Sequence, residues 1–571
     1  MKVFVKGEGE VSLDTKDFIA KGGEGSIYAR DKIAYKIFED PKKMIPYGKI
    51  QELSVLDHPD IVKPERLILD AHQVPIGYTM KYVKDNLALC QLFTKAFRVR
   101  NKVTPAQTIR IVRKLHDMVA SIHSKNILIV DLNELNFLIS SNLDRLYAID
   151  VNCYQTKSFP ATAIMESVRD RHCKHNQFNQ GTDWFSFAVL ATQLLVGIHP
   201  YKGGHPQFEN TPLDERMDAR MKANISIFNP KATVPAVCQS FDVIPPAMKN
   251  WLIAVLEDGQ RESPPRDYSA VIARVATAVR QISGTDVFEL KQLASYMHDI
   301  LAVYFSTGVR VVVTTDDIVI NNRQYHLPNP NIKVGFTKMN TPIGVWIENG
   351  MLKAHDILRQ KELQLSCAAT HVTESGGRLY AVAGNSVFEL QLMEQGETIM
   401  TSLRHVGNVL DVPGATQVFD GVVLQNLLGK WYASIFPKSG QCVQIKLNCL
   451  DSYQVVEAAY ENHVLVIVGI DQKTGRYDRL VIKLDATFSN MDVRKVLNIV
   501  HTGLNFTVGD QGTAVFINEE EKVEATSMKF NAPIHVFDDK SIDGDMLLFH
   551  EGAVTTVAKG NKLYSFTYKR K

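Results

Sequence analysis

The sequence contains no apolar segment long enough to cross a lipid bilayer. Its longest clean apolar run, VLVIVGI at residues 464–470, has the length of a β-strand, whereas a membrane-spanning helix needs about 20 apolar residues. The opening residues MKVFVKGEGEVSL also lack the apolar core of a secretion signal. These absences predict a chain with neither a membrane span nor a signal peptide.

Paired cysteines and an excess of one charge are missing as well. The seven cysteines are scattered without metal-site spacing, which is typical of reduced thiols in a reducing compartment. His172, Cys173 and His175 are close in sequence, but no second cluster completes four ligands, so zinc is not favoured. The net charge of +2 gives no reason to expect a nucleic-acid or membrane surface. We therefore predict a cytoplasmic protein with no nucleic-acid or membrane partner.

The stretch at residues 127–150, ILIVDLNELNFLISSNLDRLYAID, combines apolar runs with polar residues that are candidates for catalysis or metal binding. Asp131 and Asn136 lie five apart in a loop between apolar runs, and Asp150 ends a later run. One carboxylate can orient a hydroxyl group, while the other carboxylate and the amide can hold magnesium against phosphate oxygens. The alternative is an ordinary β-hairpin with polar turn residues.

A glycine-rich hairpin is predicted near the N-terminus, in FIAKGGEGSIYARDKIAYKIF. Strand patterns flank Gly22, Gly23 and Gly25, and glycine lets a backbone approach a phosphate closely and offer it N–H groups. Lys36 follows on the next strand and alternates with Ala34, so the two share one face. The pattern indicates a phosphate-binding loop, with a plain turn as the alternative.

In order and spacing, these segments resemble the protein kinase family. IAKGGEGSIY is similar to I-G-x-G-x-x-G-x-V-Y, and AYK is similar to A-x-K. HSKNILIVDLNELNFLI aligns without gaps to H-S-x-x-h-h-H-R-D-L-K-P-x-N-h-L-I, where h is apolar, and Asp150-Val151-Asn152 stands for D-F-G. GTDWFSFAVLATQLLVGIHPYKG resembles a buried helix of the family. The resemblance covers roughly residues 14–282, and its motifs are similar to those of bacterial-type kinases.

The resemblance implies a catalytic centre for Mg·ATP. Asn136 and Asp150 would bind Mg²⁺, Asp131 would orient the acceptor hydroxyl, and Lys36 would hold phosphates. The phosphates would also contact the backbone of the glycine-rich loop, at Gly22, Gly23 and Gly25.

The resemblance also implies an adenine pocket. YTMKYV is similar to the segment that joins the two lobes, with Met80 in the gatekeeper position. Main-chain groups from Lys81 to Val83 would hydrogen-bond the base. The apolar walls would be Ile19, Ile27, Ala34, Val83 and Leu138.

Two positions depart from the family in ways that affect phosphate binding. The segment LDHPDIV resembles the family's H-P-N-I-V motif, and counting back ten residues from its Pro59 places Lys49 where the family has the glutamate that pairs with the phosphate-binding lysine. Glu52, one helical turn later, could substitute if the helix register shifts; otherwise the pairing is rebuilt elsewhere or the lobe is not catalytic. Asn133 replaces a lysine that helps to hold the transferred phosphoryl group.

Other positions bear on the segment after Asp150. Val130 replaces the arginine that pairs with a phosphate on this segment, so activity should not need phosphorylation there. Glu166 is predicted to pair with Arg261, as the family's late glutamate and arginine do. Asp183 is predicted to cap the backbone of the catalytic loop.

The C-terminal half has a different sequence pattern, in which short runs typical of β-strands are separated by turns rich in Gly, Asn and Asp. A weak unit recurs, as in GRLYAVAGNSVFEL and GRYDRLVIKL. At about 40–50 residues per unit, residues 308–571 would hold about five or six units of a β-propeller, and a pair of β-sandwiches is the alternative. This half carries no catalytic cluster, which favours a binding or sensing platform.

The predicted fold is therefore multidomain α+β, a bilobal kinase-like fold followed by an all-β domain. The predicted parts are an N-lobe (1–83), a helical C-lobe (84–282), a linking helix (283–307) and the all-β domain (308–571). The leading functional hypothesis is an ATP-dependent protein kinase that modifies a protein hydroxyl, with Ser or Thr favoured by the family alone. The all-β domain would bind a partner or ligand whose identity the sequence does not give. The rival hypothesis is a pseudokinase scaffold that binds nucleotide or partners and transfers nothing.

Overall fold

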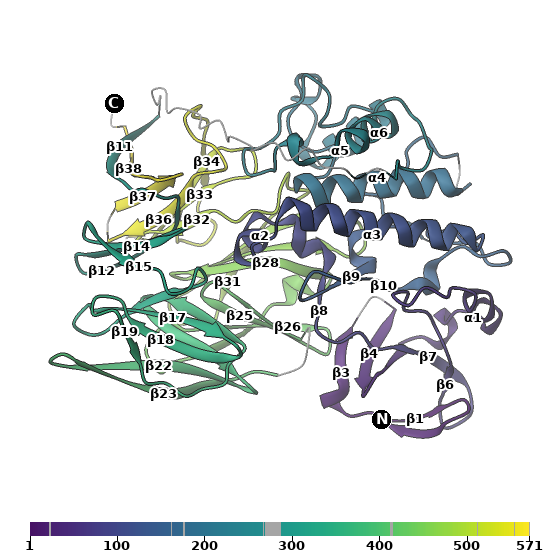
Figure 1. Cartoon of the computed structure of the whole chain (residues 1–571), viewed down its shortest axis with the longest axis horizontal. Helices are drawn as coiled ribbons and strands as arrows, with labels where there is room; N and C mark the ends of the chain where they lie inside the picture. Colours follow the sequence, from purple (N-terminus) through teal and green to yellow (C-terminus); the bar gives the residue numbers. More distant parts are fainter. Residues whose placement is uncertain are drawn as a thin grey trace.

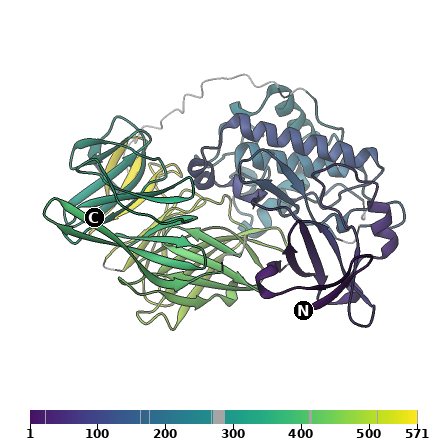
Figure 2. The ribbon, with the colours of Figure 1, turned by 60° about the horizontal axis from the view of Figure 1, so that its bottom comes forward.

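The computed structural model describes the chain apart from residues 22–23, 162, 175–176, 267, 269–286, 411–414, 511, 553 and 570–571. A small β lobe, a helical lobe and a large group of small sheets lie side by side (Figure 1). The β lobe, in purple, lies below the helical lobe, and the small sheets occupy the opposite side of the molecule (Figure 2).

The β lobe is built on one antiparallel sheet with the strand order β2-β1-β6-β7-β5-β4-β3. Its strands are β1 (Lys2–Val5), β2 (Gly9–Ser12), β3 (Phe18–Lys21), β4 (Gly25–Arg30), β5 (Ile33–Phe38), β6 (Leu67–Leu69) and β7 (Pro75–Lys81), with helix α1 (Tyr47–Leu53) between β5 and β6. Asp31, at φ 57°, makes the tight turn from β4 to β5. Tyr35 and Ile37 of β5 point into the core of the lobe, which places Lys36 on the opposite face.

The helical lobe contains α2 (Lys95–Arg100), α3 (Pro105–Ser124), α4 (Gln180–Val196), α5 (Leu213–Ala223) and α6 (Pro246–Leu256). Thr104 caps α3, because its hydroxyl accepts a hydrogen bond from the Gln107 N–H at 3.2 Å. Every residue of α4 from Thr182 to Val196 is buried, so the prediction of a helix buried on all sides is confirmed. No helix in the described part of the chain is long and apolar enough to cross a membrane. Residues 269–282 of the predicted lobe lie outside the described residues.

A three-stranded sheet at the boundary of the two lobes carries the polar loop found in the sequence. Its strands are β8 (Asn86–Ala88), β9 (Phe137–Ser140) and β10 (Leu146–Ala148), in the order β10-β9-β8. The loop with Asp131 precedes β9, and Asp150 follows β10. Because β9 and β10 pair as an antiparallel hairpin, the start of one strand and the end of the other lie at the same edge.

Residues 288–568, called the seven-sheet half below, form seven four-stranded antiparallel sheets within the described residues. The strands of the seven sheets are β12 (Ile300–Ser306), β13 (Val309–Thr314), β14 (Asp317–Ile320) and β15 (Arg323–His326); β16 (Lys333–Phe336), β17 (Pro342–Glu348), β18 (Met351–Asp356) and β19 (Lys361–Leu363); β20 (His371–Ser375), β21 (Arg378–Ala383), β22 (Ser386–Gln395) and β23 (Thr398–Asn408); β24 (Thr416–Phe419), β25 (Val422–Leu427), β26 (Lys430–Ile435) and β27 (Val443–Lys446); β28 (Tyr453–Glu461), β29 (Val464–Asp471), β30 (Tyr477–Leu484) and β31 (Met491–Val496); β32 (Phe506–Val508), β33 (Thr513–Ile517), β34 (Val523–Ser527) and β35 (Ile534–Phe537); and β36 (Leu547–Glu551), β37 (Val554–Lys559) and β38 (Lys562–Tyr568) with β11 (Phe288–Ser295).

The last of these sheets joins the start of the half to its end. Its strand order is β11-β38-β37-β36, and Phe288 of β11 stacks on Phe566 of β38 with ring centroids 4.5 Å apart. Strand β36 contacts both β32 and β12, and contacts also join β12 to β16, β16 to β20, β20 to β24 and β24 to β28. The sheets that begin with β28 and β32 share buried residues such as Val466 and Phe516. The order of the sheets in space therefore follows the chain and returns to its start.

Two predictions about this half are wrong. Where the structure describes the predicted linking helix (283–307), the chain forms strands β11 and β12, so the β region begins before the predicted boundary at residue 308. Strand β11 pairs along β38 near the end of the chain, and this distant partner overrides the helical pattern of the local sequence. The predicted five or six β units are too few, because the described residues form seven sheets.

A shared hydrophobic core joins the helical lobe to the seven-sheet half. It contains the buried faces of α3 and α4 together with Val468 and Ile470 of β29 and Tyr477 of β30. An ion pair adds to this contact, since Arg100 of α2 lies 3.1 Å from Glu457 of β28. The seven-sheet half is therefore packed directly against the lobe that carries the polar loop.

Candidate nucleotide and phosphoryl-transfer site

A continuous cavity of about 2960 Å³ lies between the two lobes. It extends into the seven-sheet half along strands that each begin one of its sheets, such as β12, β16 and β20. All described residues that the sequence predicts for the nucleotide site line this cavity: Ile19, Gly25, Ile27, Ala34, Lys36, Lys81, Val83, Asp131, Asn136, Leu138 and Asp150. Gly22 and Gly23 lie outside the described residues. The fold thus brings side chains from both lobes into one space.

The apolar part of the cavity lies where β5, β7 and β9 approach one another. Ala34 of β5 pairs with Met80 of β7, and Leu138 of β9 lines the same space from the other lobe. The Lys81 ammonium donates to the Pro59 carbonyl at 2.9 Å, and Pro59 lies away from the cavity lining. Any contact of Lys81 with a base would therefore come from its main chain, as the resemblance implies.

Lys36 is buried and is held by several acceptors. Its Nζ lies 2.8 Å from Asp150 Oδ1, 3.3 Å from Glu24 Oε2 and 3.2 Å from Asn152 Oδ1. Tyr78 also donates its hydroxyl to Asn152 Oδ1, at 2.8 Å. Burial by itself would lower the pKa of the Lys36 ammonium, but Asp150, Tyr78 and Glu24 together hold that pKa well above its ordinary value. A permanently charged lysine at this place suits binding of phosphate oxygens.

The alternative partner for Lys36, Glu52, is in the wrong place. Glu52 accepts a hydrogen bond from the Ser158 N–H at 3.1 Å on the exposed side of α1, so a shift of the helix register is excluded. Lys49 does face inward and is 5% exposed. Burial lowers the pKa of Lys49, while Glu24 acts in the opposite direction. Because Glu24 interacts with both lysines, it reduces the repulsion that two cations would otherwise exert on each other.

The loop that carries Asp131 is held from beneath by Asp183. The Asp183 carboxylate accepts hydrogen bonds from the N–H groups of Ile129 and Val130, at 2.8 and 2.9 Å, so the predicted capping role is confirmed. Val130 has φ 64°, a left-handed conformation that is uncommon for a β-branched residue. The two hydrogen bonds fix this strained turn, and the turn directs the next residue, Asp131, toward the cavity.

Asp131 and Asn136 lie together at the cavity edge of β9. Asn136 Nδ2 donates to the Asp131 main-chain oxygen at 2.8 Å and approaches Asp131 Oδ2 at 3.4 Å. Asp131 Oδ1 accepts a hydrogen bond from the Met165 N–H at 2.8 Å. Burial raises the pKa of Asp131, and the Met165 hydrogen bond opposes that rise. The amide of Asn136 therefore presents its oxygen away from Asp131, where a cation can use it.

The residues around Asp150 suit magnesium that is bound together with a phosphate. The described residues contain no cluster of three or more His, Cys, Asp or Glu side chains that would hold a metal alone. Asp150 and Asn136 supply two oxygen donors on one cavity, and the Asp150 side chain is 44% exposed. Mg²⁺ commonly takes one or two carboxylates and completes its shell with substrate phosphates and water. The donor set therefore fits a metal that arrives with its nucleotide.

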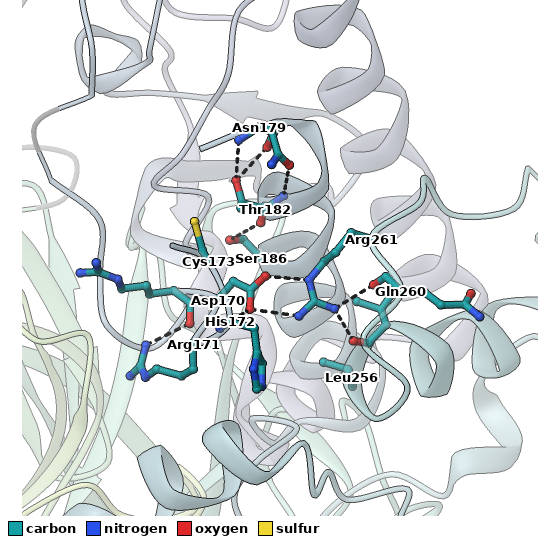
Figure 3. A network of polar contacts seen from close by, with 12 residues as sticks. Asp170, Arg171, His172, Cys173, Asn179, Thr182, Ser186, Leu256, Gln260 and Arg261 are labelled. Atoms are coloured by element: carbon teal, nitrogen blue, oxygen red, sulfur yellow. Dashed lines mark hydrogen bonds and ion pairs between the residues drawn. The ribbon is translucent and has the colours of Figure 1, made fainter. Parts of the chain in front are cut away.

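The ion pair predicted between Glu166 and Arg261 is wrong. Arg261 pairs instead with Asp170, with Nε 2.7 Å from Oδ2 and Nη2 3.0 Å from Oδ1 (Figure 3). Glu166 contacts Arg169 and Arg171 on the surface of the same segment. The arginine thus anchors the segment four residues later than the alignment suggests, because Asp170 is the buried carboxylate.

Sequence reasoning did not identify Glu24 and Asn152 as partners of Lys36. Glu24 lies within the glycine-rich loop, and Asn152 stands where the family triplet ends in glycine. The asparagine at this place was the available signal, because a side chain replaces a hydrogen atom beside the predicted metal ligand. Its effect on Lys36 depends on a contact between residues 116 positions apart, which the local sequence does not reveal.

Comparison with known proteins gives limited likeness. No protein-family model matches the chain. Over 188 residues the chain is 22% identical to a protein of Heliothis zea nuclear polyhedrosis virus named serine/threonine-protein kinase 1. The aligned region is 32% of this chain and 68% of that relative. The solved structure of the Cydia pomonella granulovirus kinase is 17% identical, with a TM-score of 0.31, over 42% of this chain and 88% of that chain. The predicted likeness to bacterial-type kinases and the cytoplasmic location stay predictions.

Proposed function

We propose that the chain is an ATP-dependent protein kinase that transfers a phosphoryl group to a serine or threonine hydroxyl. The observation that carries this proposal is the convergence of Lys36, Asp131, Asn136 and Asp150 on one cavity between two lobes. These residues come from three separate segments of the chain, β5, the loop before β9 and the end of β10, and no single structural requirement explains all four together. The partial identity with a viral serine/threonine kinase supports the same activity.

Each of the four residues has a chemical role in this proposal. Lys36 binds phosphate oxygens with its fixed positive charge, and Asp150 and Asn136 hold the Mg²⁺ that neutralises charge on the phosphates. Asp131 orients the acceptor hydroxyl and takes its proton. In the structure Asp131 Oδ1 accepts a hydrogen bond from the Met165 N–H, and the remaining lone pairs of the two carboxylate oxygens are the sites for the acceptor hydroxyl.

We also propose that the seven sheets are the blades of a β-propeller. The separate four-stranded sheets, their neighbour contacts and the strand β11 that completes the last sheet support this architecture over a pair of sandwiches. A last blade built from strands of both ends of the half ties the ring of sheets together, and radial repetition leaves only short edges. In this proposal the ring binds a protein partner or ligand beside the site.

The rival function is a pseudokinase scaffold that binds Mg·ATP without transfer. It is favoured by Lys49, which is buried where the family has a glutamate, and by the Met165 N–H already bound to Asp131. Against it, Glu24 and Asn152 supply Lys36 with the acceptors that the missing glutamate would have provided.

Transfer of label from γ-labelled ATP separates the two functions. The purified full chain is incubated with Mg·ATP and a generic protein acceptor, with a matched sample in which EDTA removes the metal. A kinase labels itself or the acceptor, and only with Mg²⁺ present. A chain that binds Mg·ATP but labels neither itself nor any candidate partner is a scaffold, and the kinase proposal is then wrong.

A further inference from the structure

The seven-sheet half reaches directly into the loop between Asp131 and Asn136. Glu134 lies in this loop, in the short 3-10 helix η4 (Glu134–Asn136), and is 1% exposed. Its Oε1 accepts a hydrogen bond from the Tyr477 hydroxyl at 2.7 Å. Tyr477 is the first residue of β30, so the contact joins residues 343 positions apart.

This hydrogen bond has few substitutes nearby. Glu134 Oε2 has no hydrogen-bond partner among the described residues, and Tyr477 is 5% exposed within the shared core. A buried carboxylate that loses its donor bears the full cost of desolvation. The Glu134 side chain therefore takes its hydrogen bond from the seven-sheet half, while Asn133 Oδ1 caps the same turn by accepting from the Leu135 N–H at 2.8 Å.

The same hairpin, β29 and β30, touches the second support of Asp131. Gly475 in its turn has φ 67°, and a Cβ there would lie 2.2 Å from Met165 Sδ. Met165 in turn donates its N–H to Asp131 Oδ1. One hairpin thus contacts both Glu134 within the loop and Met165, which donates to Asp131.

We propose that Tyr477 is a positioning residue for phosphoryl transfer and that it acts through Glu134. The inference rests on the proposed function and deepens it: the seven-sheet half completes the catalytic loop as well as binding partners. The Tyr477 hydroxyl holds Glu134, Glu134 fixes the turn of η4, and that turn sets the direction of Asn136 relative to Asp131. The phosphate-binding side of the cavity, at Lys36, is untouched by this chain of contacts.

Tyr477→Phe tests the proposal because it keeps the ring in the core and removes only the hydroxyl. We expect kcat for transfer to fall by about tenfold or more, since small misplacement of reacting groups has large effects on rate. KM for Mg·ATP should rise by a smaller factor than kcat falls, because Asn136 is one of two proposed Mg²⁺ ligands while Asp150 and Lys36 keep their contacts. Amide hydrogen exchange in residues 131–138 should become faster. Tyr453→Phe is the matched control, because Tyr453 donates to Asp478 Oδ2 at 2.6 Å within the same sheet and does not touch the loop.

A double-variant cycle tests whether Tyr477 acts through Glu134. If it does, Tyr477→Phe combined with Glu134→Gln is no slower than the slower single variant, because residues that act as a unit are not additive. Multiplying effects, equal losses in Tyr453→Phe, or wild-type rate and exchange in Tyr477→Phe would each overturn the proposal. If the wild-type chain transfers no phosphate, the kinase proposal fails, and the exchange of residues 131–138 still decides whether Tyr477 positions the loop.

Discussion

The loop at residues 131–136 and helix α1 differ in how closely they keep the arrangement expected of a kinase. In the loop, Asp131 and Asn136 lie together and are supported by Asp183 from below. In α1, the expected glutamate is replaced by the buried Lys49, and the partners of Lys36 come from elsewhere. The loop thus has the arrangement that the kinase resemblance predicts, whereas the anchor of Lys36 lies at other positions than that resemblance predicts.

A physical difference explains why one region can change and the other cannot. The loop must place a carboxylate and an amide at defined positions around an acceptor and a metal, which tolerates little displacement. The anchor of Lys36 has only to supply negative or polar oxygens near a buried ammonium. Glu24 and Asn152 meet that requirement from two other segments.

The largest expected effect tests the retained loop. Asp131→Asn should lower phosphoryl transfer by about 10²–10⁴-fold, because it removes the group that takes the acceptor proton. Mg·ATP binding should stay near the wild-type value, since Asp131 is not a proposed metal ligand. Label transfer and a binding titration are measured side by side, with Asp144→Asn in the exposed β9–β10 turn as the control. Equal transfer by Asp131→Asn and the wild type would remove Asp131 from the mechanism.

Asp150→Asn should have the next largest effect, on metal-dependent binding. The charge that holds Mg²⁺ is lost, so the affinity for Mg·ATP should fall by about 100-fold, while the weaker affinity for ATP in EDTA should change little. Isothermal titration with and without Mg²⁺ measures both. A parallel loss under the two conditions would show that Asp150 acts through Lys36 alone, contrary to its proposed role as a metal ligand.

The moved anchor is tested by Asn152→Ala. This change removes an acceptor from both Lys36 and the buried Tyr78 hydroxyl, and a lost hydrogen bond to a charged group costs about 1.5–3 kcal/mol. That cost falls on the stability of the fold; we expect Kd for Mg·ATP to rise by about tenfold, because Lys36 is then less well preorganised to meet the phosphates. Asn142→Ala, in the exposed β9–β10 turn, is the control. An unchanged Kd would mean that Asn152 is not part of the anchor.

The smallest effect is expected in the segment after Asp150. Replacing Thr156, Ser158, Thr162 and Ser167 together by Ala should change transfer by less than about twofold, because Val130 cannot pair with a phosphate as arginine does. Initial rates of label transfer check this expectation. A loss of more than about tenfold with intact nucleotide binding would show that phosphorylation of this segment matters.

The sequence predicts features that depend on neighbouring residues better than features that depend on distant ones. Asp131, Asn136 and Asp150 line one cavity as expected, because short loops and a hairpin hold them. The pairing of Arg261 with Asp170 and of Lys36 with Asn152 could not be read from spacing, since each joins residues roughly 100 positions apart. The wrong prediction of a helix where strand β11 forms has the same cause. The partner of β11, β38, lies at the other end of the seven-sheet half, and local periodicity carries no signal of that pairing.

Thermal unfolding of the full chain shows whether the cavity between the lobes is a Mg·ATP site. A ligand that binds only the folded state stabilises it by about 2.7 kcal/mol at 100 times its Kd. We predict that Tm rises with Mg·ATP in a saturable way, and rises less with ATP in EDTA. An unchanged Tm at millimolar Mg·ATP, for a chain that is folded, would contradict both the kinase and the scaffold.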